Sequence, residues 1–393
     1  MELVPEAPEG LRRVIRFAVA FVLISLPALA EPWPVRLGER RGVLHEYAQP
    51  IAGWFGRTVM SRDTGNVFDD PQAVAALLEQ AGISADDLRF EQRSAHIVGV
   101  RGPRDGEQSD GFRYAVFASA QPLDDGSARL HRTWFRFRST DQSKGLAVVM
   151  PGMLGTPYQF VDVLESALLA DGWAVLRMLV PPSRSTERLE VQIDIDAPNS
   201  SVAALAAELD ERSAECAFAV DAGVSWVHKQ LPSLDRKPIV VIGMSGTGMM
   251  LPAVLVGNPD VFDAAVVIGS GANAFRILRE TSYVDMLDAV RVSWEPRKPS
   301  STELDALDEL YLGYASLDAA RLAPTIKDTP MLLIHGSSDR AVPAETGDLL
   351  WEKLGRPERW TTPVGHELLF VRTLLRVPRL VDWLNEHAGG IEE

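Results

Sequence analysis

The sequence predicts an α/β fold with a mostly parallel central sheet and helices on both of its faces. Two observations lead to this prediction. From residue 146 onward, short and wholly apolar segments recur, and longer segments of helical periodicity lie between them. Wholly apolar strands are typical of a parallel sheet that is buried on both faces, and their alternation with helices indicates right-handed βαβ units. The predicted strands cover residues 146–150, 173–180, 238–243, 264–269 and 331–335.

The segments around these strands have equally clear patterns. Helical periodicity predicts helices at residues 158–170, 202–230, 249–256 and 345–354, and a last short strand at 359–363. Two earlier segments, 112–118 and 130–138, alternate between side chains that can face opposite ways. This alternation favours antiparallel strands at one edge of the sheet.

An insert of residues 272–327 separates the fourth and fifth apolar strands and is too long for a plain crossover. Ser300 and Glu303 have the spacing of a capping box, which predicts the start of a helix. An amphipathic stripe follows, formed by Leu304, Leu307, Leu310, Tyr311, Tyr314 and Leu317. The insert is interpreted either as a lid over a site or as extra helices that cover the core.

Composition bounds the possible partners. The chain has 393 residues, 46% hydrophobic and 24% charged, with a formal net charge of −15 and a pI near 5.0. A net negative field disfavours binding of nucleic acid or of anionic membrane surfaces. Cys216 is the only cysteine, so no intramolecular disulfide can form, and its place in a helical pattern favours a buried small residue over a nucleophile.

The N-terminal 30 residues have the pattern of an export signal. Arg12, Arg13 and Arg16 precede the uncharged run 17–30, which ends in the small-x-small sequence closed by Ala30. We therefore expect a signal peptide at residues 1–30 and a periplasmic or secreted protein. The alternative is a retained N-terminal anchor, which would be the protein's one membrane contact. Residues 31–110 are assigned as an N-terminal extension, and residues 111–388 as the α/β domain.

A candidate nucleophile lies where an apolar strand runs into a glycine-rich turn. Residues 239–248 read Ile-Val-Val-Ile-Gly-Met-Ser-Gly-Thr-Gly, and a stretch compatible with a helix follows. A serine on such a turn, here Ser245, is lifted above the carboxyl end of the sheet with its hydroxyl exposed. The spacing of a dinucleotide-binding or phosphate-binding glycine loop is not present in this segment.

This segment resembles the nucleophile elbow Gly-x-Ser-x-Gly of the α/β-hydrolase family. Residues 243–247 match it except at the last position, where Thr247 replaces glycine and Gly248 follows. Residues 331–343 resemble the family's penultimate-strand motif, in which an acid three residues after a glycine precedes Val-Pro. The resemblance covers about residues 110–388. It implies an α/β-hydrolase fold and a triad in the order serine, acid, histidine.

The resemblance assigns Asp339 and His366 as the partners of Ser245. A serine hydroxyl is a weak nucleophile until a base accepts its proton, and imidazole can do so near neutral pH. An ionised Asp339 would hold the ring of His366 in the required tautomer and stabilise the imidazolium. The acid comes 94 residues after the serine and the histidine 27 residues after the acid, which leaves room for the expected helices and strands.

The tetrahedral intermediate also needs backbone N–H donors for its oxyanion. One is expected from Gly246, next to the nucleophile. Residues 149–156 resemble the family's oxyanion turn with Pro151 in place of a histidine, which makes Met153 the second expected donor. The alternative interpretation of this segment is an ordinary strand-to-helix loop.

The resemblance implies a serine hydrolase that works without a cofactor. The expected substrate is a small-molecule ester, cleaved through an acyl-serine intermediate. An exported peptidase or amidase with a peptide substrate is the alternative, and a catalytically silent binding protein on the same fold is a rival from another class. No metal site is expected, because His366 lacks a second histidine at zinc-motif spacing, and Asp194 and Asp196 lack the remaining residues of a calcium loop.

Overall fold

The computed structural model describes residues 41–47, 113–122, 128–140, 142–152, 156–179, 181–186, 189–283 and 290–388. The predicted signal peptide, most of the predicted extension and Met153 lie outside these residues. None of the described helices combines the length and the apolar character that a membrane-spanning helix requires.

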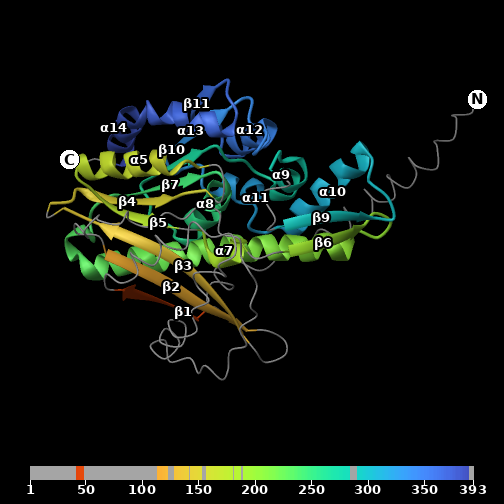
Figure 1. The fold of residues 1–393 in the computed structure, drawn as a ribbon, viewed down its shortest axis with the longest axis horizontal. Coiled ribbons are helices and arrows are strands. Elements are labelled where there is room, and N and C mark those ends of the chain that lie inside the picture. The colour runs from red at the N-terminus through yellow and green to blue at the C-terminus, as the bar shows by residue number, and fades with distance from the viewer. Residues whose placement is uncertain are drawn as a thin grey trace, which may run out of the picture.

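A large sheet forms the centre of the described part of the chain (Figure 1). Its nine strands lie in the order β1-β2-β3-β5-β4-β7-β8-β10-β11. The pairs β1/β2, β2/β3 and β3/β5 are antiparallel, and all pairs from β5 to β11 are parallel. This confirms the predicted sheet with antiparallel strands at one edge. The strands are β1 Arg41–Tyr47, β2 Arg113–Pro122, β3 Ala128–Arg138, β4 Gly145–Met150, β5 Trp173–Met178, β7 Ile239–Met244, β8 Ala264–Ile268, β10 Met331–Gly336 and β11 Glu358–Thr362.

The five apolar segments form the buried centre of this sheet. Every residue of β4, β5, β7, β8 and β10 is buried. Apolar side chains on one face pack against α5, α13 and α14, and those on the other face against α7, α8, α11 and α12. These helices are α5 Tyr158–Ala170, α7 Asn199–Gln230, α8 Gly246–Gly257, α11 Ala319–Leu322, α12 Ala344–Lys353, α13 His366–Leu374 and α14 Val377–Ala388, with a short α6 at Ser183–Thr186.

Strand β1 belongs to the segment that was assigned as an N-terminal extension. It pairs along its whole length with β2, from Arg41 opposite Ala120 to Tyr47 opposite Tyr114. The described part of the extension thus continues the central sheet at its antiparallel edge.

A second, smaller layer projects beyond one end of the sheet, and we call it the cap (Figure 1). It contains β6 Leu189–Asp194, α9 Ala274–Glu280, β9 Val290–Glu295, α10 Ser301–Tyr314 and the first third of α7. Strands β6 and β9 pair in parallel, and the cap has its own apolar cluster that includes Leu205, Phe275 and Tyr311. The predicted capping box is confirmed, since the Ser300 and Glu303 side chains each accept from the other's backbone N–H.

The cap differs from the predicted insert in its composition. Only part of it comes from residues 272–327, because β6 and the start of α7 lie before Ser245 in the chain. Helix α11, which also belongs to the insert, packs instead with the main core through Ala319, Ala320 and Leu322. The insert therefore both builds the cap and covers the core.

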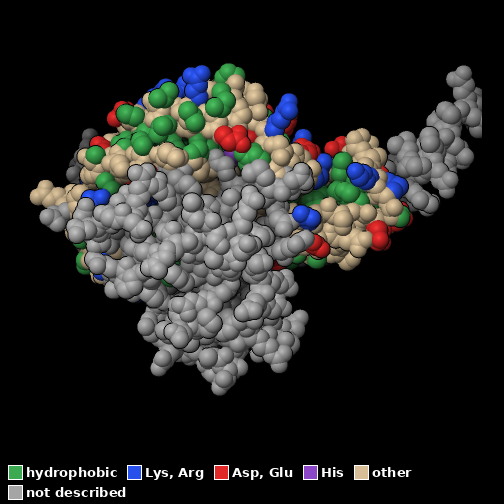
Figure 2. Space-filling model, in the orientation of Figure 1, with side chains coloured by type: hydrophobic (Ala, Val, Ile, Leu, Met, Phe, Trp, Pro, Cys, Tyr) green, Lys and Arg blue, Asp and Glu red, His purple; other side chains and the backbone are tan. Residues whose placement is uncertain are grey.

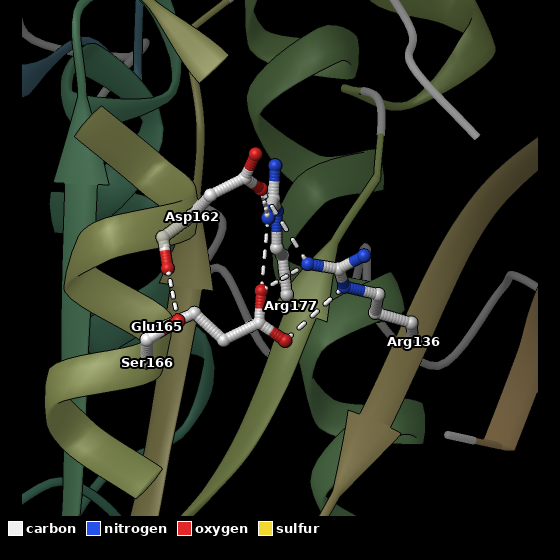
Figure 3. Close-up of polar contacts among 5 residues, drawn as sticks. All are labelled: Arg136, Asp162, Glu165, Ser166 and Arg177. Carbon is white, nitrogen blue, oxygen red and sulfur yellow. Dashed lines mark hydrogen bonds and ion pairs between the residues drawn. The ribbon is translucent and has the colours of Figure 1, made fainter. Parts of the chain in front are cut away.

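A charged cluster joins the antiparallel edge of the sheet to α5 (Figure 3). The guanidinium of Arg136 on β3 donates two hydrogen bonds to the carboxylate of Glu165. Arg177 on β5 donates to Glu165 at 2.8 Å and to Asp162 at 2.7 Å. The side chains of Glu165 and Arg177 are only 3% and 5% exposed. Each of these buried charges contacts an opposite charge, which offsets the free-energy cost of its burial.

Candidate active site

Ser245 lies on a strained turn between β7 and α8. Its backbone has φ 51° and ψ −123°, a conformation that non-glycine residues rarely adopt. The Ser245 N–H donates to the carbonyl of Ile268 at 2.9 Å, which fixes the turn on the neighbouring strand β8. The turn thus places the hydroxyl at the carboxyl end of the parallel strands, where open α/β sheets bind their ligands.

Close contact between β7 and α8 depends on two glycines of this turn. A Cβ added to Gly243 would lie 3.0 Å from the Cα atom of Gly248. A Cβ added to Gly248 would lie 2.7 Å from the Cβ of Ser270. Gly248, one residue after the family position held by Thr247, therefore allows the close packing of helix on strand.

The structure brings Ser245, His366 and Asp339 together in one hydrogen-bonded row. Nε2 of His366 lies 3.0 Å from Oγ of Ser245, and Nδ1 lies 2.6 Å from Oδ2 of Asp339. All three residues are buried. In the tautomer that carries its proton on Nδ1, the ring donates to the carboxylate and accepts from the serine hydroxyl.

The two loops that carry the acid and the histidine hold each other in place. Asp339 follows β10, and its Oδ1 atom accepts from the N–H groups of Ala341 and Val342, both at 2.9 Å. This leaves Oδ2 for the imidazole. His366 is the first residue of α13, and the N–H of Ser338 donates to the carbonyl of Val364 just before it.

Of the two expected oxyanion donors, the structure describes one. Gly246 is the first residue of α8, so the helix provides no partner for its N–H. Met153 lies outside the described residues, but the start of its turn is described. A Cβ added to Gly152 would lie 2.6 Å from the Cβ of Ser245, so the turn runs directly against the nucleophile.

Two residues beside the histidine were not found from the sequence. The ring of Tyr283 meets the ring of His366 edge-on, with 5.9 Å between the ring centres, and its hydroxyl donates to Glu367. Although burial opposes ionisation of Glu367, this hydrogen bond, a backbone hydrogen bond and the nearby His366 together lower its pKa. Glu367 adjoins the histidine in sequence, which is a usable signal, whereas nothing local marks Tyr283.

A cavity opens beside Ser245 and runs under the cap. Most of its lining is apolar: Leu209, Met249, Met250, Ala274, Ile277, Leu278, Val290, Ala319, Ala341 and Val342. Its carboxylates are engaged by the chain. Asp318 accepts from the N–H groups of Asn273, Ala274 and Ala320, and Asp210 accepts from those of Ser316 and Leu317.

Cys216 and His335 lie in environments that shift their pKa values. Burial raises the pKa of the Cys216 thiol to about 12, which opposes formation of a nucleophilic thiolate. Burial and the neighbouring Arg359 lower the pKa of His335 to about 4, so this imidazole is neutral near pH 7. Within the described ranges, no group of three or more His, Cys, Asp or Glu side chains has the arrangement of a metal site.

Charged side chains of both signs lie on the described part of the face in Figure 2. Lys and Arg side chains are scattered there among Asp, Glu and apolar side chains.

A sequence model described as the prolyl oligopeptidase family matches residues 219–362. The matched part contains Ser245 and Asp339 and ends four residues before His366. The chain is an α/β-hydrolase-fold serine hydrolase.

Solved structures with this fold resemble this chain at low sequence identity. An esterase from Pyrococcus furiosus is 16% identical, with a TM-score of 0.44; the match covers 69% of this chain and 92% of the esterase. An acylaminoacyl peptidase from Pyrococcus horikoshii is 13% identical, with a TM-score of 0.48, and the match covers 74% of this chain and 44% of the peptidase. A search of curated proteins found no match to the serine hydrolase.

Proposed function

We propose that the chain is an exported serine hydrolase that cleaves carboxylic esters, with Ser245 as nucleophile, His366 as general base and Asp339 as the acid that orients it. The observation that carries the proposal is the row of contacts at 3.0 Å and 2.6 Å through the two nitrogens of His366. In such a row the imidazole can accept the serine proton, which activates the hydroxyl as a nucleophile. The carboxylate then stabilises the imidazolium that forms.

The proposed reaction has two half-reactions. Oγ of Ser245 attacks the ester carbonyl carbon while its proton passes to Nε2 of His366, and the oxyanion lies against the N–H groups of Gly246 and Met153. The imidazolium then gives this proton to the leaving alcohol, which departs from an acyl-serine. Water, deprotonated by the same nitrogen, attacks the acyl carbon. The imidazolium then returns the proton to Oγ of Ser245 as the bond from Oγ to the acyl carbon breaks, which releases the acid and restores the serine.

The cavity beside Ser245 supports an ester with an uncharged, apolar acyl group. Its apolar lining suits hydrocarbon, and Asp210 and Asp318 already accept backbone hydrogen bonds. A carboxylate on the acyl group would lie near these two carboxylates and be disfavoured, since Arg212, which also lines the cavity, already binds Glu208 and the Ser185 carbonyl. The second candidate function, a peptidase or amidase, is favoured by the match to the prolyl oligopeptidase family.

A fluorophosphonate probe tests the proposed nucleophile. Labelling of the folded wild type at Ser245, and its loss in Ser245→Ala, is the expected result. Ser166 offers a control, since it is exposed on α5 and its hydroxyl donates to the backbone carbonyl of Asp162, and Ser166→Ala should label like the wild type. A folded wild type that never reacts would instead support the silent binding protein.

The substrate class is tested with matched acyl groups. Nitrophenyl butyrate should be cleaved faster than a nitrophenyl ester of similar length that ends in a carboxylate, and faster than aminoacyl nitroanilides. Faster cleavage of the anilides would assign a peptidase.

Export is a separate part of the proposal and rests on residues 1–30. Expression of the full chain in a bacterium, followed by fractionation and intact-mass measurement, should find a protein that begins at Glu31 outside the cytoplasm. A full-length protein in the membrane fraction would support the retained anchor, and a full-length protein in the cytoplasm would contradict export.

A further inference from the structure

Thr247, which replaces the third glycine of the elbow, makes hydrogen bonds that a glycine cannot make. Its side chain is fully buried. Its hydroxyl donates to the carbonyl of Met150 at 2.6 Å and accepts from the N–H of Met244 at 3.2 Å. The hydroxyl also lies 3.0 Å from the carbonyl of Met244, but with a single hydrogen its shorter contact is the one to Met150.

Met150 is the last residue of β4 and the start of the expected oxyanion turn. The next two residues are Pro151, which has no N–H, and Gly152, which lies against Ser245. The Gly152 N–H donates to the hydroxyl of Thr156 at 3.2 Å. Two threonine hydroxyls therefore hold the described parts of this turn, one from the elbow and one from the turn itself.

We propose that Thr247 is a positioning residue for the oxyanion turn. This inference rests on the proposed serine hydrolase function. The Thr247 hydroxyl ties the end of β4 to the turn that carries Ser245, so Gly152, two residues after Met150, keeps its place against Ser245. Oxyanion donors act within a few tenths of an ångström, and a displacement of about 1 Å lowers rates by about 100-fold.

A purely packing role does not explain these contacts. Glycine in the elbow allows the helix to approach the strand closely, and here Gly243 and Gly248 allow this approach. The methyl group of Thr247 fills space, whereas its hydroxyl adds a side-chain link at the carboxyl ends of the paired strands β4 and β7, beyond the backbone register that ends at Met150 and Gly243. The hydroxyl and the methyl group can therefore be tested separately.

The experiment compares Thr247→Ser, which keeps the hydroxyl, with Thr247→Val, which keeps the volume. With a nitrophenyl ester, Thr247→Val should lower kcat about 10- to 100-fold at nearly unchanged KM, because the tie acts on the transition state. Thr247→Ser should retain kcat within about 3-fold. Thr247→Ala, which also lacks the hydroxyl, should repeat the loss of kcat if Thr247→Val does not fold.

A matched control separates this effect from the general loss of a buried hydrogen bond. Thr373 is a buried threonine on α13 whose hydroxyl donates to the Leu369 carbonyl at 2.8 Å. Thr373→Val should lower the urea midpoint of unfolding and leave kcat unchanged. Equal losses of kcat in the Thr373 and Thr247 valine variants would contradict a positioning role.

Hydrogen exchange gives a readout that does not need catalysis. The amide of Gly152, which donates to the Thr156 hydroxyl, should exchange at least 10-fold faster in Thr247→Val and at the wild-type rate in Thr247→Ser. Unchanged exchange in Thr247→Val would overturn the inference whether or not the protein is active. An inactive wild type whose exchange responds as expected would overturn the proposed function alone.

Discussion

Nδ1 of His366 lies 2.6 Å from Oδ2 of Asp339, while the other oxygen of this carboxylate accepts two backbone N–H groups. Each oxygen of Asp339 thus has a separate task. One holds the acid loop in shape, and the other selects the tautomer of the imidazole.

This arrangement predicts the effect of Asp339→Asn. The amide can present its N–H₂ group to Nδ1, which favours the tautomer that cannot accept the serine proton, and kcat should fall by about 10³- to 10⁴-fold. Steady-state kinetics on a nitrophenyl ester measures this loss. Asp348→Asn, at an exposed position paired with Arg359, is the control and should keep wild-type kcat. An Asp339→Asn enzyme with more than a tenth of wild-type kcat would rule out the assigned role.

Gly152→Ala should abolish activity while the protein still folds. The added methyl group would lie 2.6 Å from both the Ser245 Cβ and the Thr156 Oγ1, so the turn must move away from the nucleophile. We expect kcat to fall by at least about 100-fold. Gly172→Ala is the control: Gly172 has φ 91°, and an added methyl group would make only ordinary contact with the Lys144 side chain, so the variant should cost about 1 kcal/mol of stability without changing kcat. Activity of Gly152→Ala near the wild-type level would show that this turn does not serve the site.

The low pKa of His335 predicts a pH dependence of stability. The folded protein holds this imidazole neutral down to about pH 4, whereas the unfolded chain protonates it below its ordinary pKa of 6.5. Between these values the unfolded state binds more protons, so the free energy of unfolding should decrease as pH falls from 6.5 to 4. The full contribution is at most about 3 kcal/mol and is present above pH 6.5.

Urea unfolding of the wild type and of His335→Gln at several pH values measures this effect. The glutamine variant does not titrate in this range, so its curve should be flatter by the contribution of one proton. Parallel curves for the two proteins would exclude His335 as the source.

The cluster in Figure 3 predicts a large loss of stability in Glu165→Gln. Removal of this buried charge takes away the carboxylate that Arg136 and Arg177 share, and breaking such a buried arrangement costs about 3 to 5 kcal/mol. Glu352→Ala is the control, since it removes an exposed pair with Arg356 that contributes less than about 1 kcal/mol. Similar unfolding midpoints for the two variants would contradict this prediction.

The central sheet was predictable because burial on both faces leaves a strong local pattern. The five apolar segments and the observed strands agree within two residues at each end. The cap sheet was not predicted. Its strands β6 and β9 are short, alternate apolar with polar side chains and lie about 100 residues apart, so their pairing is visible only in three dimensions.

The candidate site was likewise predictable only in part. Ser245, Asp339 and His366 lie on turns whose local sequences are characteristic, so their meeting could be inferred from order and spacing. The contact of Tyr283 with His366 arises from how the insert folds back. The hydrogen bond from Thr247 to Met150 joins residues that are 97 positions apart in the sequence. Only the structure shows that Thr247, which departs from the elbow motif, has this partner.

Helix α7 runs unbroken for 32 residues, about 48 Å, from the cap cluster to the main core. A helix of this kind cannot kink sharply in its middle without losing backbone hydrogen bonds. The wall of the cavity that α7 provides is therefore coupled to the sheet. We expect heat or denaturant to unfold both ends of α7 together. The cap and the main core should therefore unfold in one cooperative transition.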